Sequence, residues 1–78
     1  MPVSLMERFL TEEADEHVRD VLQRELRRGT SGSRYLTFNI FNVRLDFDRG
    51  VATLEDELDP QSEETMALEA FERRLSEA

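Results

Sequence analysis

The chain has no cysteine and no lysine, and it has no long hydrophobic run. Without cysteine, neither a disulfide framework nor a thiolate metal site can form. No apolar stretch approaches the roughly 18–20 residues that a membrane-spanning helix needs. The start of the chain, MPVSLMERFLTEE, lacks the basic first region of a secretory signal and carries an early glutamate. These absences predict a cytoplasmic protein without a membrane partner.

Acidic residues outnumber basic ones, and the excess lies almost entirely in the last third of the chain. The net charge is −8. Residues 1–34 carry seven acids and six arginines, residues 35–54 carry two of each, and residues 55–78 carry nine acids and two arginines. Such a field repels phosphate backbones and attracts basic proteins. The sequence therefore predicts a basic protein partner and no nucleic-acid partner.

The length of the chain, 78 residues, predicts one small domain over residues 1–78 with a thin hydrophobic core. The apolar residues fall in periodic blocks, which indicates a folded chain rather than a disordered one. GTSGS, residues 29–33, is the flexible connector that we expect in this domain. Because so small a core is close to the limit of stability, self-association is another way to bury apolar surface.

Two helical segments are expected before the connector. Ser4 and Glu7 have the spacing of a capping box, which predicts a short helix over residues 4–10. Thr11 predicts a second helix start, and apolar residues at helical spacing continue that helix to Arg28. If both segments formed one continuous helix, Leu5, Met6 and Phe9 would not lie on the same helix face as the later apolar residues. Either the helix breaks near Thr11, or these residues pack against something else, such as a second subunit. The candidates for self-association are Leu5, Met6, Phe9 and Leu10.

The middle of the chain predicts an antiparallel hairpin. YLTFNIFNVRLDF, residues 35–47, is rich in aromatic and β-branched residues, which favours one long strand. Its apolar alternation changes phase at residues 40–42, where a β-bulge would bring both sets onto one face. Residues 48–50, Asp-Arg-Gly, predict the loop. VATLEDEL, residues 51–58, predicts the return strand, with Phe47 opposite Val51.

The last segment predicts a helix. Asp59 suits an N-cap and Pro60 suits the first helical position, so the helix could begin there or several residues later, near Met66. Its buried stripe is expected at Ala67, Leu68, Phe71 and Leu75. The order helix, antiparallel hairpin, helix predicts an α+β fold in which the helices pack on one face of a small sheet.

Motifs for catalysis or metal binding are incomplete. Asp46, Asp48 and Glu57 have the spacing of a calcium-binding loop, but Gly50 comes one position too early for such a loop. The single histidine, His17, has no further ligands that would complete a zinc site. A phosphate-binding loop requires a lysine, and paired-carboxylate catalysis requires a cleft between the two groups. We therefore expect no enzyme activity, no metal and no cofactor.

The acidic run LEDELDPQSEE, residues 54–64, is the candidate binding site. Helix capping would explain its later acids. Three successive acids in a strand repel one another and have low β-propensity, so folding alone explains residues 55–57 poorly. These acids either protect a sheet edge from pairing or recognise a basic partner. The candidate contact residues are Glu55, Asp56, Glu57, Asp59, Glu63 and Glu64.

Residues 43–75 combine VRLDFDRGVATLEDELDP, a hairpin with an acidic strand, with TMALEAF, a helix start that contains Leu68-Glu69-Ala70-Phe71. This succession resembles small bacterial immunity proteins that neutralise nuclease toxins, as in contact-dependent growth inhibition. Ala67 departs from the pattern, which has Ser or Thr at this place. The resemblance implies that Glu55, Asp56, Glu57 and Asp59 cover a basic nucleic-acid-binding cleft on a toxin.

Two functions remain open on the sequence. The first is an acidic protein-binding module that neutralises a basic partner, such as a nuclease toxin. The alternative is a structural protein that forms a homodimer through its apolar N-terminal segment and its long strand, with the acids on its solvated exterior. Salt separates the two, because charge-led binding weakens as ionic strength rises and a hydrophobic dimer persists.

Overall fold

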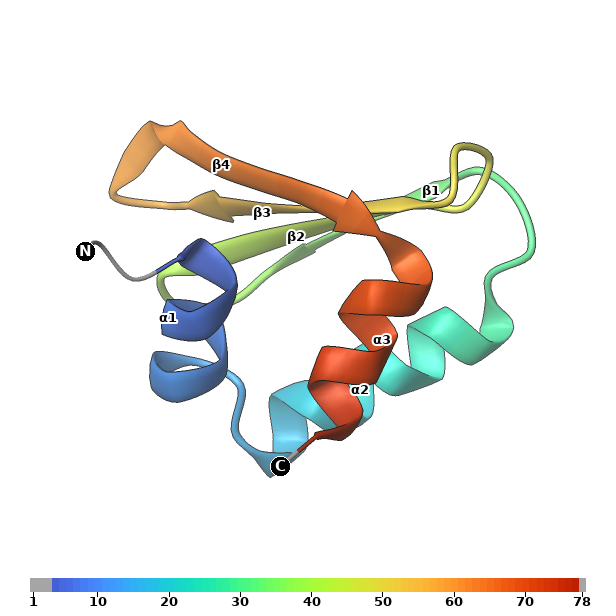
Figure 1. The fold of residues 1–78 in the computed structure, drawn as a ribbon, viewed down its shortest axis with the longest axis horizontal. Helices are drawn as coiled ribbons and strands as arrows, with labels where there is room; N and C mark the ends of the chain where they lie inside the picture. The colour runs from blue at the N-terminus through green and yellow to red at the C-terminus, as the bar shows by residue number, and fades with distance from the viewer. Residues whose placement is uncertain (1–3, 78) are drawn as a thin grey trace.

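The computed structural model describes residues 4–77. Four strands form one antiparallel sheet in the order β1-β2-β3-β4, so each strand pairs with its neighbours in sequence. In this part of the chain, all three helices lie on one face of the sheet, and the other face carries no helix (Figure 1). The elements are α1 (Leu5–Glu12), α2 (Glu16–Arg28), β1 (Ser33–Thr37), β2 (Phe41–Asp46), β3 (Val51–Asp56), β4 (Asp59–Ala67) and α3 (Leu68–Ser76). The predicted α+β fold with helices on one face is confirmed, although the sheet has two strands more than the expected hairpin.

The first two helices are separated by a short break. Ser4 Oγ accepts a hydrogen bond from the Glu7 N–H at 3.1 Å, so the predicted cap of α1 is confirmed. The prediction that a second helix starts at Thr11 is wrong, because α1 continues through Thr11 to Glu12. Asp15 caps α2 instead, and its Oδ1 accepts from the Val18 N–H at 2.9 Å.

The segment predicted as one long strand is two strands, β1 and β2. The chain reverses at residues 38–40, and the Phe38 N–H donates to the Phe41 carbonyl at 2.9 Å. The apolar alternation therefore changes phase because of a turn, and no bulge joins the two halves. Val43 pairs with Leu36 across this hairpin. Residues from both strands thus contribute to the helix-facing side of the sheet.

The pairing of β2 with β3 differs by one residue from the predicted register. Asp46, rather than Phe47, lies opposite Val51, and the turn is residues 47–50 with Gly50 at φ +70. A shift of one residue moves every side chain to the other face. In the observed register Val43 pairs with Leu54 and both are buried, whereas the predicted register would have paired Val43 with a glutamate.

The segment after Asp59 is a strand, so the prediction that a helix begins at Pro60 is wrong. The Asp59 carboxylate accepts hydrogen bonds from the Gln61 N–H and the Ser62 hydroxyl within its own strand. Across β3 and β4, the hydroxyls of Thr53 and Thr65 are 3.0 Å apart. The helix α3 begins at Leu68, close to the predicted later start. Its Leu68 N–H donates to the Gly50 carbonyl at 2.9 Å, which supplies a backbone partner where Ala67 offers no side-chain cap.

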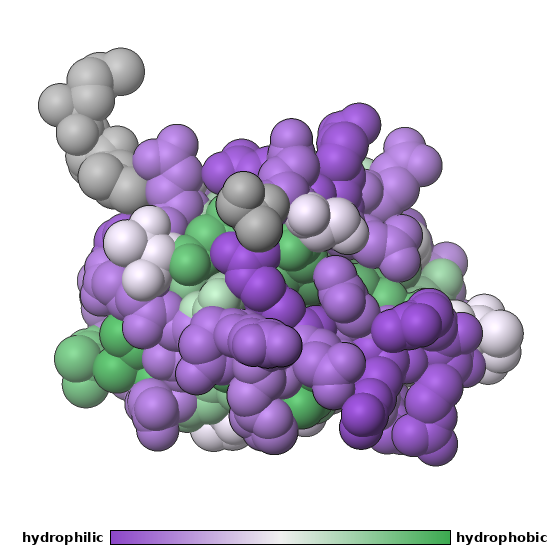
Figure 2. All heavy atoms as spheres, turned by 90° about the horizontal axis from the view of Figure 1, so that it is seen from below, coloured by the Kyte–Doolittle hydropathy of each residue, from purple (hydrophilic) through white to green (hydrophobic). Residues whose placement is uncertain are grey.

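The hydrophobic core lies between the sheet and the three helices, and Phe9 is at its centre. The Phe9 ring lies 5.6 Å from that of Phe41 and 6.3 Å from that of Phe71, between centroids. Met6 and Phe9 are fully buried within the single chain, and Leu5 and Leu10 are half-buried against the same core. The helical face is mostly hydrophilic, and apolar residues reach its surface only in separate places (Figure 2). The core residues are Met6, Phe9, Ala14, Val18, Leu22, Phe41, Val43, Leu45, Ala52, Leu54, Phe71 and Leu75.

Candidate protein-binding surface

The six carboxylates predicted as a binding site are divided between the two faces of the sheet. Glu63 pairs with Glu55 across β3 and β4, and Glu64 pairs with the buried Leu54. Because side chains alternate along a strand, Glu55 and Glu63 lie on the face without helices and Glu64 lies on the helical side. Asp56 is buried, whereas Glu57 and Asp59 are exposed in and beside the β3–β4 turn.

Asp56 is a structural residue. It is only 7% exposed, and its carboxylate accepts hydrogen bonds from the Leu58 N–H at 2.9 Å and from Arg8 Nη1 at 3.2 Å. The hydrogen bond from the Leu58 N–H lowers the pKa of Asp56, burial opposes that change, and Arg8 lowers the pKa further. The net shift is downward, so the contacts favour the ionised form of Asp56 inside the fold.

Glu64 has a comparable role at the start of α1. Its Oε1 accepts a hydrogen bond from the Leu5 N–H at 3.1 Å, at the helix end where backbone N–H groups lack partners and negative charge is favourable. Asp56 in β3 and Glu64 in β4 thus hold α1 against the β3–β4 hairpin through hydrogen bonds with Arg8 and the Leu5 N–H. No local sequence pattern indicates these two contacts, because the partners are 48 and 59 positions apart in the chain.

The other four carboxylates form what we call the acidic face: Glu55, Glu57, Asp59 and Glu63. Glu55 accepts from the Tyr35 hydroxyl at 2.6 Å, and Glu57 accepts from Asn42 Nδ2 at 2.5 Å. Within residues 4–77, no member of the acidic face forms an ion pair with an arginine. The nearest cation shown beside this face is Arg44, whose guanidinium lies on the Tyr35 ring rather than in an ion pair with a carboxylate. The hydrogen bond to Glu55, with some burial, raises the pKa of Tyr35.

The pairing of Glu55 with Glu63 is unfavourable for folding. These residues lie directly opposite each other on the face without helices. Like charges in such cross-strand pairs are destabilising. Folding therefore explains Asp56 and Glu64, which contact α1, but leaves this pair unexplained.

Two large apolar side chains are exposed in the same region. Tyr35 is 51% exposed and Leu58 is 82% exposed. Leu58 lies in the β3–β4 turn between two members of the acidic face, Glu57 and Asp59. Its N–H is held by Asp56, and the preceding Glu57 N–H donates to the Ile40 carbonyl at 2.9 Å. The turn therefore presents an apolar side chain in a fixed backbone conformation, between two acidic residues of the chain.

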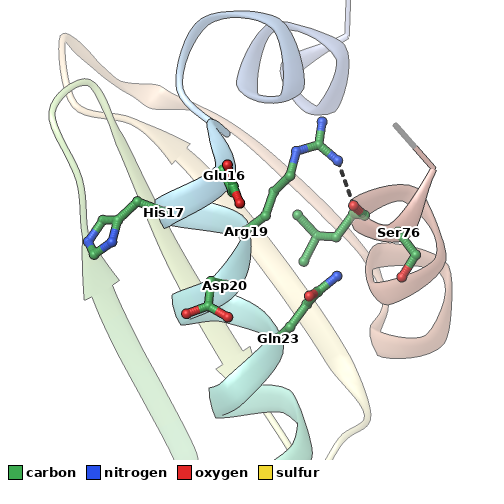
Figure 3. Close-up of a pocket in the computed structure, with 7 residues that line it drawn as sticks. Glu16, His17, Arg19, Asp20, Gln23 and Ser76 are labelled. Atoms are coloured by element: carbon green, nitrogen blue, oxygen red, sulfur yellow. Dashed lines mark hydrogen bonds between the residues drawn. The ribbon is translucent and has the colours of Figure 1, made fainter.

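A groove lies between α2 and α3, and side chains of both helices line it (Figure 3). Arg19 reaches from α2 to α3, where its Nη1 donates to the Leu75 carbonyl at 2.5 Å. His17 is exposed and points away from α3 (Figure 3). The Ser76 hydroxyl donates to the Glu72 carbonyl at 3.1 Å, so it is not paired with the histidine. The contacts across this groove therefore hold two helices together.

The residues considered for calcium binding lie at opposite ends of the β2–β3 hairpin. Asp46 and Asp48 accept backbone hydrogen bonds from Arg49 and Gly32 near one turn, and Glu57 contacts Asn42 at the other end. Among the residues that the structure describes, no three His, Cys, Asp or Glu side chains are grouped to hold a metal ion. In the same part of the chain, every helix is too short or too polar to cross a membrane.

Comparisons of the chain with models of known protein families, with curated proteins and with solved structures gave no match. A functional proposal therefore depends on the chemistry of the acidic face and on the residues around it.

Proposed function

We propose that this chain is a small acidic binding module without catalytic activity, which acts in the cytoplasm by covering a basic surface of a partner protein. The observation that carries the proposal is the acidic face, whose four carboxylates lack arginine partners among the described residues and include both chain neighbours of the exposed Leu58. Such a surface attracts a positively charged protein and repels nucleic acid.

The arrangement also has the composition of a specific interface. An apolar side chain within a polar rim is the usual organisation of a binding hot spot. Leu58 would provide the apolar contact, and Glu57 and Asp59 would provide charged contacts on either side. Because hydrogen bonds to Asp56 and Ile40 already fix the backbone of this turn, little conformational entropy would be lost on binding.

A nuclease toxin is the class of partner that we propose. A nuclease presents a cationic cleft to phosphate groups, and carboxylates at suitable spacing can occupy the same positions. The resemblance of residues 43–75 to immunity proteins supports this class. Relative to what that resemblance implies, the contact set changes: Asp56 is buried against Arg8, and Glu63 lies beside Glu55.

The main physical argument for a homodimer does not apply to this fold. It depended on exposed apolar residues in the N-terminal segment, and Met6 and Phe9 are 1% and 0% exposed in a single chain. The long strand that would have contributed to the dimer is a hairpin. We therefore propose the basic partner alone.

The proposal is tested by affinity capture from the native host with two variants of equal charge. The first neutralises the acidic face by Glu55→Gln, Glu57→Gln, Asp59→Asn and Glu63→Gln. The control neutralises four exposed carboxylates on the helices or at the end of α3 by Glu16→Gln, Glu69→Gln, Glu72→Gln and Glu77→Gln. We expect the native chain and the control to retain a basic protein that is released by salt, and the first variant to lose it.

Protection from toxicity provides the functional measurement. The reading frame next to this gene is expressed with each variant, and growth is recorded. We expect the native chain and the helix control to restore growth and the acidic-face variant to fail. Equal protection by both variants would show that the acidic face is not the inhibitory surface.

A further inference from the structure

A hollow of about 220 Å³ opens beside the acidic face, on the side of the sheet without helices. Three adjacent strands line it: Tyr35 comes from β1, Asn42 from β2, and Glu55 from β3. Glu57 in the following turn closes one side, and Asp56 also contributes to the lining. The hollow is therefore built on paired strands rather than on a mobile loop.

Asn42 shows that the hydrogen bonding in this hollow is incomplete. The side chain is nine-tenths buried, with 8% of its surface exposed, and its Nδ2 donates to Glu57 Oε2. Its carbonyl oxygen, Oδ1, is buried and accepts no hydrogen bond from any residue that the structure describes. Buried polar atoms without partners are uncommon, and each one needs an explanation. Among the residues that the structure describes, it is the only buried side-chain nitrogen or oxygen without a hydrogen-bond partner.

The carboxylate oxygens of the hollow are also acceptors, whereas the Tyr35 hydroxyl already donates to Glu55. Glu55 and Glu57 contribute carboxylate oxygens, and Asn42 has already used an amide hydrogen on Glu57. The complementary ligand is therefore a cation with several N–H donors. The Tyr35 ring adds a flat aromatic surface, and Arg44 Cζ lies 5.4 Å from its centroid. This intramolecular contact shows that a guanidinium can lie on the ring.

We propose that the hollow binds the guanidinium of one arginine side chain of the partner protein. This inference rests on the proposed function and specifies how the basic partner is recognised. Arginine suits the hollow better than lysine because its planar group carries five N–H donors, stacks on aromatic rings and is weakly hydrated. A lysine ammonium satisfies fewer acceptors and interacts with the carboxylates as a point charge.

The experiment compares two small probes, N-acetyl-arginine methylamide and N-acetyl-lysine methylamide, by NMR titration of the folded chain. We expect the arginine probe to shift the Asn42 side-chain amide and the backbone amides of Glu55 and Glu57. We expect its dissociation constant to be lower than that of the lysine probe by a factor of about three or more. Equal affinity for the two probes, or no saturable shift at these residues, overturns the arginine assignment.

Two substitutions of Tyr35 separate stacking from charge. Tyr35→Leu removes the ring, and we expect the preference for arginine over lysine to disappear. Tyr35→Phe keeps the ring and removes the hydroxyl that donates to Glu55, which frees a carboxylate oxygen for the probe. Arginine binding should therefore be kept or strengthened in Tyr35→Phe. Loss of arginine binding in Tyr35→Phe overturns the assignment, provided that its amide spectrum shows the native fold.

Failure of this inference is distinguishable from failure of the proposed function. Equal binding of both probes removes the arginine site, but charge-led capture of the partner by the acidic face would still stand. Unchanged capture by the acidic-face variant would instead remove the proposed function itself. The helix control variant, which keeps Tyr35, Asn42, Glu55 and Glu57, should bind the arginine probe as the native chain does.

Discussion

Arg8 Nη1 donates to Asp56 Oδ2 at 3.2 Å, so α1 is joined to the end of β3 by two residues that are 48 positions apart. The same guanidinium lies over the Phe41 ring, with its Cζ 5.4 Å from the centroid. Asp56 is thus the inward-facing member of the acidic triplet at residues 55–57, while Glu55 and Glu57 contact side chains of the opposite face. One short acidic segment therefore serves both folding and surface charge.

The pH dependence of stability provides a test of the Arg8–Asp56 pair. The folded-state pKa of Asp56 is lowered, so its stabilising contribution is complete above the ordinary aspartate pKa of about 3.9 and is lost as the pH falls through the folded value. We expect Asp56→Asn to lower the melting temperature at neutral pH. The difference from the native chain should narrow below about pH 4.

Glu12→Gln is the control for this prediction, because Glu12 also contacts Arg8 but is exposed. Its melting temperature should follow that of the native chain across the pH range. Some acid sensitivity should persist in Asp56→Asn, because the hydrogen bond with Arg34 lowers the pKa of Glu25 as well. A difference between Asp56→Asn and the native chain that stays constant with pH would contradict the assignment.

Neutralising the cross-strand pair Glu55–Glu63 should not weaken the fold. We expect the double substitution Glu55→Gln and Glu63→Gln to raise the free energy of unfolding by roughly 0.2–1 kcal/mol, because it removes a like-charge pair. Urea denaturation at low salt measures the change. The gain should shrink in high salt, which screens exposed charges. A clear loss of stability would show that these carboxylates support the fold.

Phe9 tests whether the N-terminal segment belongs to the core or to a dimer interface. Phe9→Ala should cost about 3–5 kcal/mol, because the ring is completely buried among other aromatic rings. That is a large part of the roughly 4–12 kcal/mol expected for a domain of this size. Leu10→Ala, at a half-buried position, should cost less. Circular dichroism and sedimentation equilibrium together give the result. If the native chain is a dimer and Phe9→Ala is a folded monomer, the result would instead support a dimer interface at the N-terminal segment.

Glu13 fixes the turn between β1 and β2. Its Oε1 accepts hydrogen bonds from the backbone N–H groups of Asn39 and Ile40, the second at 3.3 Å, and the residue is buried. Glu13→Ala should cost about 1–3 kcal/mol for each donor that stays without a partner. Glu13→Gln retains an acceptor oxygen and should have a smaller effect. Equal loss in the two variants, measured by thermal unfolding, would indicate that packing rather than hydrogen bonding is responsible.

Gly29 is required by the position of Phe47. Its φ of −78 is accessible to any residue, but a Cβ at this position would overlap the Phe47 ring. We expect Gly29→Ala to cost about 1–3 kcal/mol by overpacking. The cost should nearly vanish when Phe47→Ala is also present, which a double-mutant cycle measures. Gly32→Ala is the contrast, because Gly32 has φ +75 and nothing near its Cβ, so its cost should not depend on Phe47.

Local signals in the sequence located some of the helix ends and turns. The cap at Ser4, the turn at Gly50 and the phase change near Ile40 all correspond to features of the structure. A short turn and a bulge change the apolar alternation in the same way, so the phase change alone does not distinguish the observed turn from the expected bulge. The β2–β3 register was wrong by one residue because the turn includes Phe47, and only burial of Leu54 opposite Val43 determines that choice.

Strand β4 could not be predicted because its conformation depends on its partner. Asp59 and Pro60 are typical of a helix start, and Glu63 and Glu64 have low β-propensity. Pairing with β3 overrides these preferences. The division of the six acids between two faces follows from that pairing, so local sequence patterns do not predict it either. Of the six predicted contact residues, Asp56 and Glu64 contact α1 instead, and a binding role for the other four stays a prediction.

The sequence-adjacent strand order has a consequence for the path of folding. Each pair of strands closes a short loop, whereas the contact between Leu5 and Glu64 spans 59 positions. Loop-closure entropy delays such distant contacts, so the sheet should form before α1 docks on it. In native-state hydrogen exchange, the amides of α1 should open at lower free energy than those of β2 and β3. The helix α1 would then be the first part of the domain to undock. Its undocking would expose Met6, Phe9 and the apolar side of the sheet together.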